Sequence, residues 1–210
     1  MDLAEFIILI FSAFYTAIKI RGWYRRLPEV KPVKRDKVIK YVLGLLPVVS
    51  LFIILYTLRF LASFDVVNDK IYIILYTLLG YTWTFLGMKL VFRFFDISWI
   101  DDALLLNNKA ALYTVSGAFL GLVIIYSGAN IGDGPGWWCV LFAGGLGLIT
   151  WFLLGRIIHS FTQAFERITI DRDISCGIRI GTYLLASGII LARASAGDWT
   201  SFYSTIVEFL

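Results

Sequence analysis

The sequence predicts an all-α membrane protein, with about six helices crossing the bilayer. First, 59% of the 210 residues are hydrophobic and only 16% are charged, whereas soluble domains are about 45–50% apolar and about 25% charged. Second, apolar stretches long enough to span a bilayer recur along the chain. Third, basic residues concentrate in one segment beside these stretches, a pattern typical of membrane orientation signals. Lipid is therefore expected to solvate most of the chain.

The apolar stretches define six expected spans. A membrane helix needs about 20 mostly apolar residues, and its backbone groups must bond internally because lipid offers no partners. The first span is the weakest, because few of its residues lie between charged positions, and its flanks lack the features of a cleavable signal peptide. We therefore expect it to remain as an anchor. The expected spans are 3–20, 41–64, 71–92, 110–131, 137–158 and 174–196.

The distribution of charge predicts the orientation. Segment 21–40 is rich in arginine and lysine and carries only two acidic residues, Glu29 and Asp36. By the positive-inside rule it belongs in the cytoplasm, which places both termini outside. We expect a multi-pass protein of the bacterial inner membrane. The basic segment either fixes the orientation alone or also binds anionic lipid or a cytoplasmic protein, and the residues expected to bind are Arg25, Arg26, Lys34, Arg35 and Lys37.

The C-terminal part of the chain repeats itself. TWTFLG at 82–87 in the third span matches TWFLLG at 150–155 in the fifth. A polar linker follows each copy and leads to a helix with an aligned glycine, Gly117 in the first and Gly181 in the second. Each copy holds two spans, so both copies run the same way through the membrane. The sequence thus predicts a tandem parallel duplication of a two-helix unit.

This duplication divides the chain into three expected regions. Residues 1–70 form two spans joined by the basic cytoplasmic loop, 71–136 form the first repeat, and 137–210 form the second repeat with a short outer-surface helix at its end. Small residues four apart let membrane helices approach closely. We therefore expect a tight core built from spans three to six, with spans one and two at its edge, and with close packing at Gly117, Gly121, Gly147, Gly177 and Gly181.

The duplicated unit, with its Asn- or Asp-rich step before a glycine-bearing helix, resembles a bacterial inner-membrane family, the domain of unknown function DUF350. The resemblance covers about residues 81–199, chiefly NNKAAL, DRDISCGIRIG and the outer ends GDGPGWW and AGDW. The second copy departs from the usual asparagine step, with Asp171 and Asp173 in its place. The family has no assigned reaction. Its members accompany phage-shock-type and polyamine-related genes, so the resemblance implies a role in envelope stress or membrane integrity.

Four residues of the polar steps and one arginine are the candidate polar or ion-contacting residues: Asn107, Asn108, Asp171, Asp173 and Arg179. Asn and Asp are favoured as helix N-caps, so the steps either cap the helices that follow or form a polar site at the axis of the repeat. Arg179 lies inside the sixth span, where a charge is usually paired. We expect it to pair with Asp171 or Asp173, the alternative being a permeation element.

No pattern in the chain indicates catalysis. His159 is the sole histidine, so no metal-ligand cluster is expected. Nucleophile elbows, phosphate loops and dinucleotide fingerprints are absent. We expect no enzyme activity, cofactor, metal or nucleic-acid partner.

Two functions remain from the sequence. The first is a non-enzymatic membrane component, a homo-oligomer or a member of a larger assembly with other proteins, serving envelope stress or membrane integrity. The alternative is a small channel or transporter for ions or polyamines, motivated by the parallel repeat and Arg179. The first requires Asn108, Asp173 and Arg179 to be sealed between helices. The second requires them to line a wetted cavity.

Overall fold

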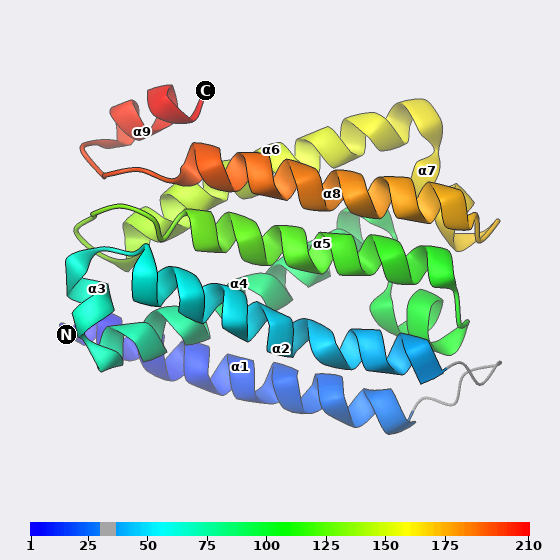
Figure 1. Cartoon of the computed structure of the whole chain (residues 1–210), viewed down its shortest axis with the longest axis horizontal. Helices are drawn as coiled ribbons and strands as arrows, with labels where there is room; N and C mark the ends of the chain where they lie inside the picture. The colour runs from blue at the N-terminus through cyan, green and yellow to red at the C-terminus, as the bar shows by residue number, and fades with distance from the viewer. Residues whose placement is uncertain (30–36) are drawn as a thin grey trace.

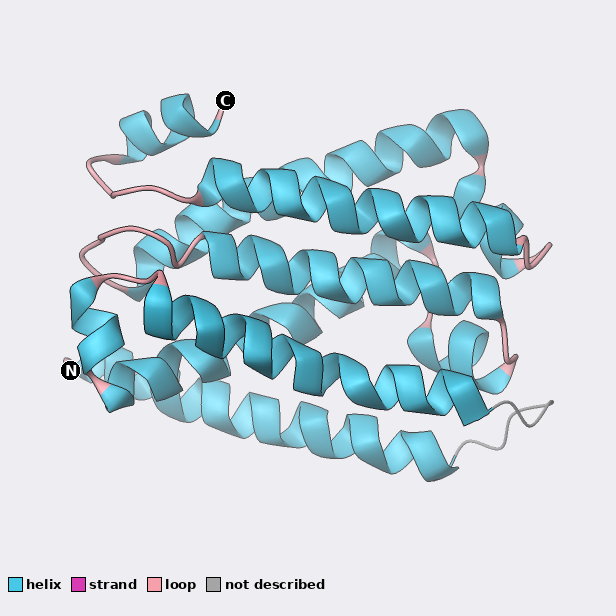
Figure 2. Ribbon diagram, viewed as in Figure 1, coloured by secondary structure: helices cyan, strands magenta, loops and turns pink. Residues whose placement is uncertain are grey.

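The computed structural model describes residues 1–29 and 37–210. Within them, six helices are long and apolar enough to cross a membrane: α1 (Leu3–Glu29), α2 (Lys37–Phe60), α4 (Lys70–Phe95), α5 (Lys109–Gly128), α6 (Trp137–Thr162) and α8 (Ile174–Ser195). The shorter elements are α3 (Phe64–Asn68), the π-helix η1 (Trp99–Leu105), α7 (Ala164–Thr169) and α9 (Phe202–Phe209). The described residues form no strand (Figure 2). The prediction of an all-α, multi-pass membrane protein is confirmed.

The long helices form two layers. α2, α5 and α8 lie side by side at the front of Figure 1, and α1, α4 and α6 lie behind them. α5 is the central helix, because it contacts α2, α4, α6 and α8 and is buried at most positions from Ala110 to Gly128. The expectation that both spans one and two lie at the edge is therefore only half right. α1 is largely exposed, but α2 packs directly against α5.

Pro47 explains how α1 joins this arrangement. A proline inside a helix has no N–H for the carbonyl four residues earlier, and its ring disturbs the preceding turn. In α2 the carbonyl left free is that of Leu43, and the indole Nε1 of Trp23 donates to it at 3.0 Å. The hydroxyl of Tyr24 donates to the Gly44 carbonyl at 2.9 Å. The proline thus frees one of the two carbonyls that hold the end of α1.

The end of α1 differs from the sequence expectation. In its last turns Trp23 is 2% exposed and stacks on Trp99 with ring centroids 3.8 Å apart. α1 continues to Glu29 instead of ending near residue 20. The added turns include an ion pair one turn apart, between Arg25 and Glu29 (2.6 Å), and such pairs support a helix beyond the hydrocarbon.

α5 and α8 run in the same direction with their backbones in contact (Figure 1). A Cβ on Gly117 would overlap the carbonyl of Gly181, and a Cβ on Gly177 would lie 2.5 Å from the Ala110 Cα. The Thr114 hydroxyl donates across the contact to the Gly177 carbonyl at 3.2 Å. Two further glycines meet neighbouring helices equally closely. Their added Cβ atoms would lie 2.7 Å from the Leu184 carbonyl oxygen for Gly121 and 2.8 Å from the Ser195 hydroxyl oxygen for Gly147.

The two halves of the repeat region share several backbone features. α4 and α6 each end at a residue in the left-handed conformation, Asp96 and Gln163, both with φ of 50°. α5 and α8 each begin at a capping residue, Asn108 and Asp173. Matching conformations at matching places are what a repeated two-helix unit would produce. The duplication itself, and the division into three regions, stay predictions.

Candidate functional site

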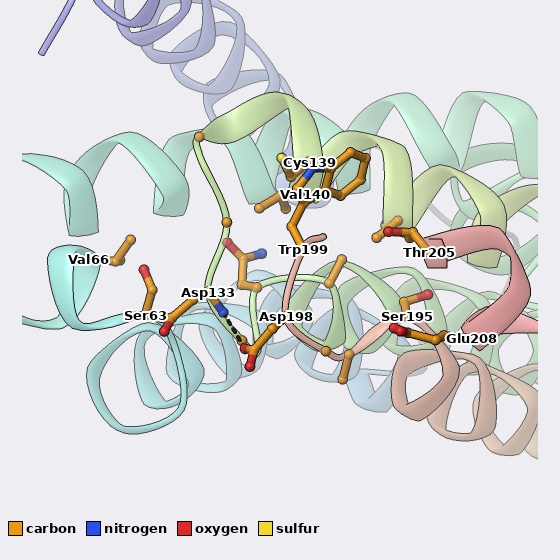
Figure 3. Close-up of a pocket in the computed structure, with 18 of the residues that line it drawn as sticks. Ser63, Val66, Asp133, Cys139, Val140, Ser195, Asp198, Trp199, Thr205 and Glu208 are labelled. Carbon is orange, nitrogen blue, oxygen red and sulfur yellow. Dashed lines mark hydrogen bonds between the residues drawn. The ribbon is translucent and has the colours of Figure 1, made fainter. Parts of the chain in front are cut away.

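The loops that follow α5 and α8 are hydrogen-bonded to each other at the end of the bundle that carries both termini (Figures 1 and 3). The backbone N–H of Gly197 donates to the Ile131 carbonyl at 3.0 Å, and that of Trp199 donates to the Asp133 carbonyl at 2.7 Å. The Asp198 carboxylate accepts from the N–H of Asp133 at 2.8 Å. One Gly-Asp step follows α5 and the other follows α8, so this junction fastens the C-terminal ends of the two central parallel helices.

Glycine is required where these loops cross. Gly132 has φ of +108°, a region that side-chain-bearing residues rarely adopt. A Cβ at Gly132 would also overlap the carbonyl of Gly197. The close approach of the two chains therefore depends on the absence of a side chain at this position.

A small cavity of about 60 Å³ lies beside the junction. Figure 3 shows Asp133 and Asp198 together at its centre, with Ser63 on one side and Ser195 and Glu208 on the other. The three carboxylate residues are exposed. One water takes about 30 Å³, so the cavity has room for waters or a small ion. Among the described residues, no group of three His, Cys, Asp or Glu is placed to hold a metal ion.

The predicted polar steps lie at the opposite end of the bundle, where α5 and α8 begin. The Asn108 side chain is 2% exposed. Its Oδ1 accepts from the N–H of Ala111 at 3.2 Å, and its Nδ2 donates to the Ile168 carbonyl at 2.7 Å. Asp173 accepts from the N–H of Cys176 at 3.1 Å. Both side chains therefore act as helix caps and hold the neighbouring turn, and Asn108 is sealed between helices.

The remaining two residues of these steps do not join a shared site. Asn107 adopts the left-handed conformation with φ of 51°, and its Oδ1 is buried without a hydrogen-bond partner among the described residues. Asp171 is exposed in the turn before α8. The structure thus brings the capping residues of α5 and α8 to adjacent helix starts, and it does not assemble all four polar residues around a cavity.

The family of the chain follows from a comparison with known protein families. The model described as Domain of Unknown Function (DUF350) matches residues 41–195, which is most of the chain and runs from α2 to the end of α8. The chain belongs to the DUF350 family. The resemblance drawn from the polar steps and outer ends is thereby confirmed. No curated protein and no solved structure matches the chain.

The match also clarifies the role of α2 in this DUF350 protein. It begins at residue 41 and so includes nearly all of α2, while α1 lies outside it. This agrees with the packing, in which α2 contacts the central helix α5 and α1 lies at the edge. The family unit is therefore larger than the region from residue 81 onward that carries the resemblance.

Arg179 does not make the ion pair expected from the sequence. Asp173 instead pairs with Arg167 of α7, with 3.0 Å between the guanidinium nitrogen and the carboxylate oxygen. Six residues of α-helix turn through about 600°, so Arg179 points well away from the direction of Asp173 at the helix start. Arg179 is exposed on α8, and it makes no ion pair with any residue that the structure describes.

The basic residues of segment 21–40 have different surroundings. Arg25 pairs with Glu29, Lys37 begins α2 and is exposed, and Lys34 and Arg35 lie outside the described residues. Arg26 lines a groove with two cations that sequence reasoning had not grouped with it, Lys19 and Lys89. No sequence signal predicts this grouping, because it depends on the packing of α1 against α4.

The cap at Asp173 predicts a pH-dependent contribution to stability. The hydrogen bond from the Cys176 N–H, helped by the nearby Arg167, lowers the pKa of the Asp173 carboxyl below its usual value. The contribution is therefore fully present above the pKa of the unfolded chain, about 3.9, and is lost as the pH falls through the lower folded-state pKa. Asp173→Ala should lower the Tm at neutral pH by a few degrees, and this difference should shrink below about pH 4.

The measurement is thermal unfolding of the detergent-solubilised protein between pH 7 and pH 3. Asp171→Ala is the matched control, because Asp171 is exposed and caps no helix. Equal Tm values for the two variants at neutral pH would contradict the capping role.

Proposed function

We propose that this DUF350 protein is a non-enzymatic component of the bacterial inner membrane that assembles with further copies of itself and supports envelope integrity. The observation that carries the proposal is the outward face of α8. Successive steps of four and three residues place six exposed side chains on one stripe of this helix: Ser175, Arg179, Thr182, Ala186, Ile189 and Arg193.

This α8 stripe differs from a surface suited to lipid. The exposed face of α2 presents bulky apolar side chains, as at Leu45, Phe52 and Phe60. The middle of the α8 stripe instead has small residues, Thr182 and Ala186. Small residues let a second helix approach closely, and a threonine hydroxyl can hydrogen-bond across such a contact. The stripe therefore favours a protein neighbour over acyl chains.

Arg179 constrains how the copies meet. An arginine inside a span costs at least a few kcal/mol unless it is paired or reaches the headgroups, and this one has no partner in its own described chain. A two-fold contact of α8 with α8 would bring two copies of Arg179 together. We therefore propose a head-to-tail contact, in which the stripe meets a different face of the next copy. Contacts of this kind form a ring when the rotation between copies closes.

The interior of the bundle favours an assembly component over a channel within one chain. Asn108 is enclosed and engaged in capping, and α5 and α8 touch through their backbones. The two candidate residues that begin these helices therefore line no passage between them. An ion or polyamine path through a single copy has no supporting observation here.

The proposed orientation keeps segment 21–40 in the cytoplasm and both termini outside. Its support is the separation of charge along the bundle. Both termini lie at one end (Figure 1), and the exposed acidic residues Asp133, Asp198 and Glu208 lie at that same end. Arg21, Arg25 and Arg26 lie at the opposite end, on the last turns of α1.

The test is the native mass of the protein extracted with its surrounding lipid. The wild-type chain should have the native mass of an oligomer. The double variant Thr182→Leu and Ala186→Leu should yield a folded monomer, because the larger side chains prevent close approach of the next copy. Thr182→Ser with Ala186→Ser is the matched control, because it keeps both residues small and should preserve the oligomer. A wild-type monomer without partners would refute the proposal, and a complex with a different protein would refute the self-assembly.

The role in the envelope is tested in cells that lack the protein. Wild-type chain and the serine control should restore growth under membrane stress, while the leucine pair should not, provided that all three reach the membrane in equal amounts. Full rescue by a monomeric leucine pair would separate the function from the assembly and contradict this part of the proposal.

A further inference from the structure

A cationic groove lies between α1, α4 and η1, at the bundle end opposite the termini. Its volume is about 420 Å³. Lys19 and Arg26 from α1 and Lys89 from α4 supply the charge, and Ile18, Met88 and Phe92 supply apolar walls. The stacked indoles of Trp23 and Trp99 also line the groove. We use the name cationic groove for this site.

The two lysines of the groove converge on one aromatic ring. The Nζ of Lys19 lies 5.3 Å from the centroid of the Tyr15 ring, and the Nζ of Lys89 lies 5.7 Å from it. An ammonium group over an aromatic face is stabilised by the ring quadrupole. Two ammonium groups at one ring nevertheless repel each other, and this repulsion is strong beside a low-dielectric membrane.

Little acidic charge among the described residues around the groove balances this cluster. Lys19, Arg26 and Lys89 form no ion pair with the described residues. Among the described residues that line the groove, the one carboxylate is Asp101, whose Oδ2 already accepts the Ser98 hydroxyl at 2.9 Å. Three cations that face a shared space with one engaged carboxylate leave a net positive site. An anion is the missing complement.

The walls of the groove identify the kind of anion. Ile18 and Phe92 are exposed apolar residues, and about two turns before Ile18 in α1 the ring of Phe11 stacks on Tyr15 with centroids 6.1 Å apart. An apolar surface therefore continues from the charged cluster toward the middle of the bilayer. This combination matches a molecule with an anionic head and hydrocarbon tails.

We propose that the cationic groove binds an anionic phospholipid, with the phosphate group held by Lys19, Lys89 and Arg26 and the acyl chains along α1 and α4. The site is separate from the α8 stripe, so the proposal of lipid binding does not depend on the proposed assembly. The bound lipid would neutralise the lysine pair and fasten α1, the least buried span, to the rest of the bundle.

The test is lipid binding to the purified full-length protein, measured by native mass spectrometry with phosphatidylglycerol and, separately, phosphatidylcholine. Phosphatidylglycerol should bind more tightly. The pair Lys19→Gln and Lys89→Gln should weaken it about 25-fold, which is about fivefold for each charge. Arg93→Gln and Arg172→Gln are the matched controls, since these exposed arginines do not line the groove, and they should change the affinity less than about twofold.

Equal affinity of the glutamine pair and the wild type for phosphatidylglycerol would overturn the proposal, and so would equal binding of the two lipids. Displacement of phosphatidylglycerol by excess inorganic phosphate would also overturn it, because it would indicate a site for the free anion. A lipid-dependent Tm keeps the test decisive if the glutamine pair does not fold. Phosphatidylglycerol should raise the Tm of the wild-type chain more than phosphatidylcholine does. Equal increases with the two lipids would also refute the proposal.

Discussion

Gly117→Ala is expected to destabilise the protein by at least about 3 kcal/mol, the upper part of the usual range for overpacking a core. The added Cβ would overlap the carbonyl of Gly181, which belongs to the backbone of α8 and has no rotamer to change. Relief requires α5 and α8 to separate. Because α5 also contacts α2, α4 and α6, that movement would disturb packing throughout the bundle.

The measurement is the Tm and the yield of monodisperse protein in detergent. Gly145→Ala on α6 is the matched control, because no atom lies within 4 Å of the position of its added Cβ. It should fold as well as the wild type or slightly better, since alanine favours a helix over glycine by about 1 kcal/mol. If Gly117→Ala behaved like Gly145→Ala, the backbone contact between α5 and α8 would be wrong.

Trp151→Ala is expected to cost about 3–5 kcal/mol, as is usual for truncating a buried tryptophan. The Trp151 side chain is fully buried, and its Nε1 donates to the Leu184 carbonyl of α8 at 2.8 Å. Its ring lies against Phe95 of α4, with centroids 5.9 Å apart, and beside Gly121 of α5. One side chain of α6 therefore contacts three other helices, and its loss leaves a cavity at their meeting point.

Two further variants separate the contributions of Trp151. Trp151→Phe keeps most of the aromatic ring but removes the hydrogen bond. It should therefore destabilise the protein less than Trp151→Ala does, with a difference of about 2 kcal/mol or more between the two variants. Trp138→Ala on the same helix is the control, because Trp138 is only partly buried and packs on Trp199 and Phe202 in the tail. In thermal unfolding, Trp151→Ala should lower the Tm more than Trp151→Phe or Trp138→Ala does. Equal losses for Trp138→Ala and Trp151→Ala would contradict the central position of Trp151.

Hydropathy and local sequence determined the elements of this protein. The six apolar stretches correspond to six long helices. The predicted first residues 71, 110, 137 and 174 lie within one residue of the observed starts of α4, α5, α6 and α8. A span is stabilised by transferring its own side chains to lipid while its backbone bonds internally, so each can be found without knowing its neighbours. Capping is equally local, which is why the Asn and Asp steps coincide with helix starts.

Only the tertiary structure decided which helices meet and which charges gather. The sequence placed α2 at the edge, whereas packing places it beside α5, and Pro47 leaves the Leu43 carbonyl free to accept from α1. It offered Arg179 as the partner of Asp173, whereas α7 brings Arg167 to that carboxylate. Lys19 and Lys89 are far apart along the chain and share the ring of Tyr15 only because α1 packs on α4. In a membrane, lipid solvates any apolar helix face about equally well. Close packing and hydrogen bonding therefore determine which helices associate. Both depend on surfaces formed by residues that are distant in sequence.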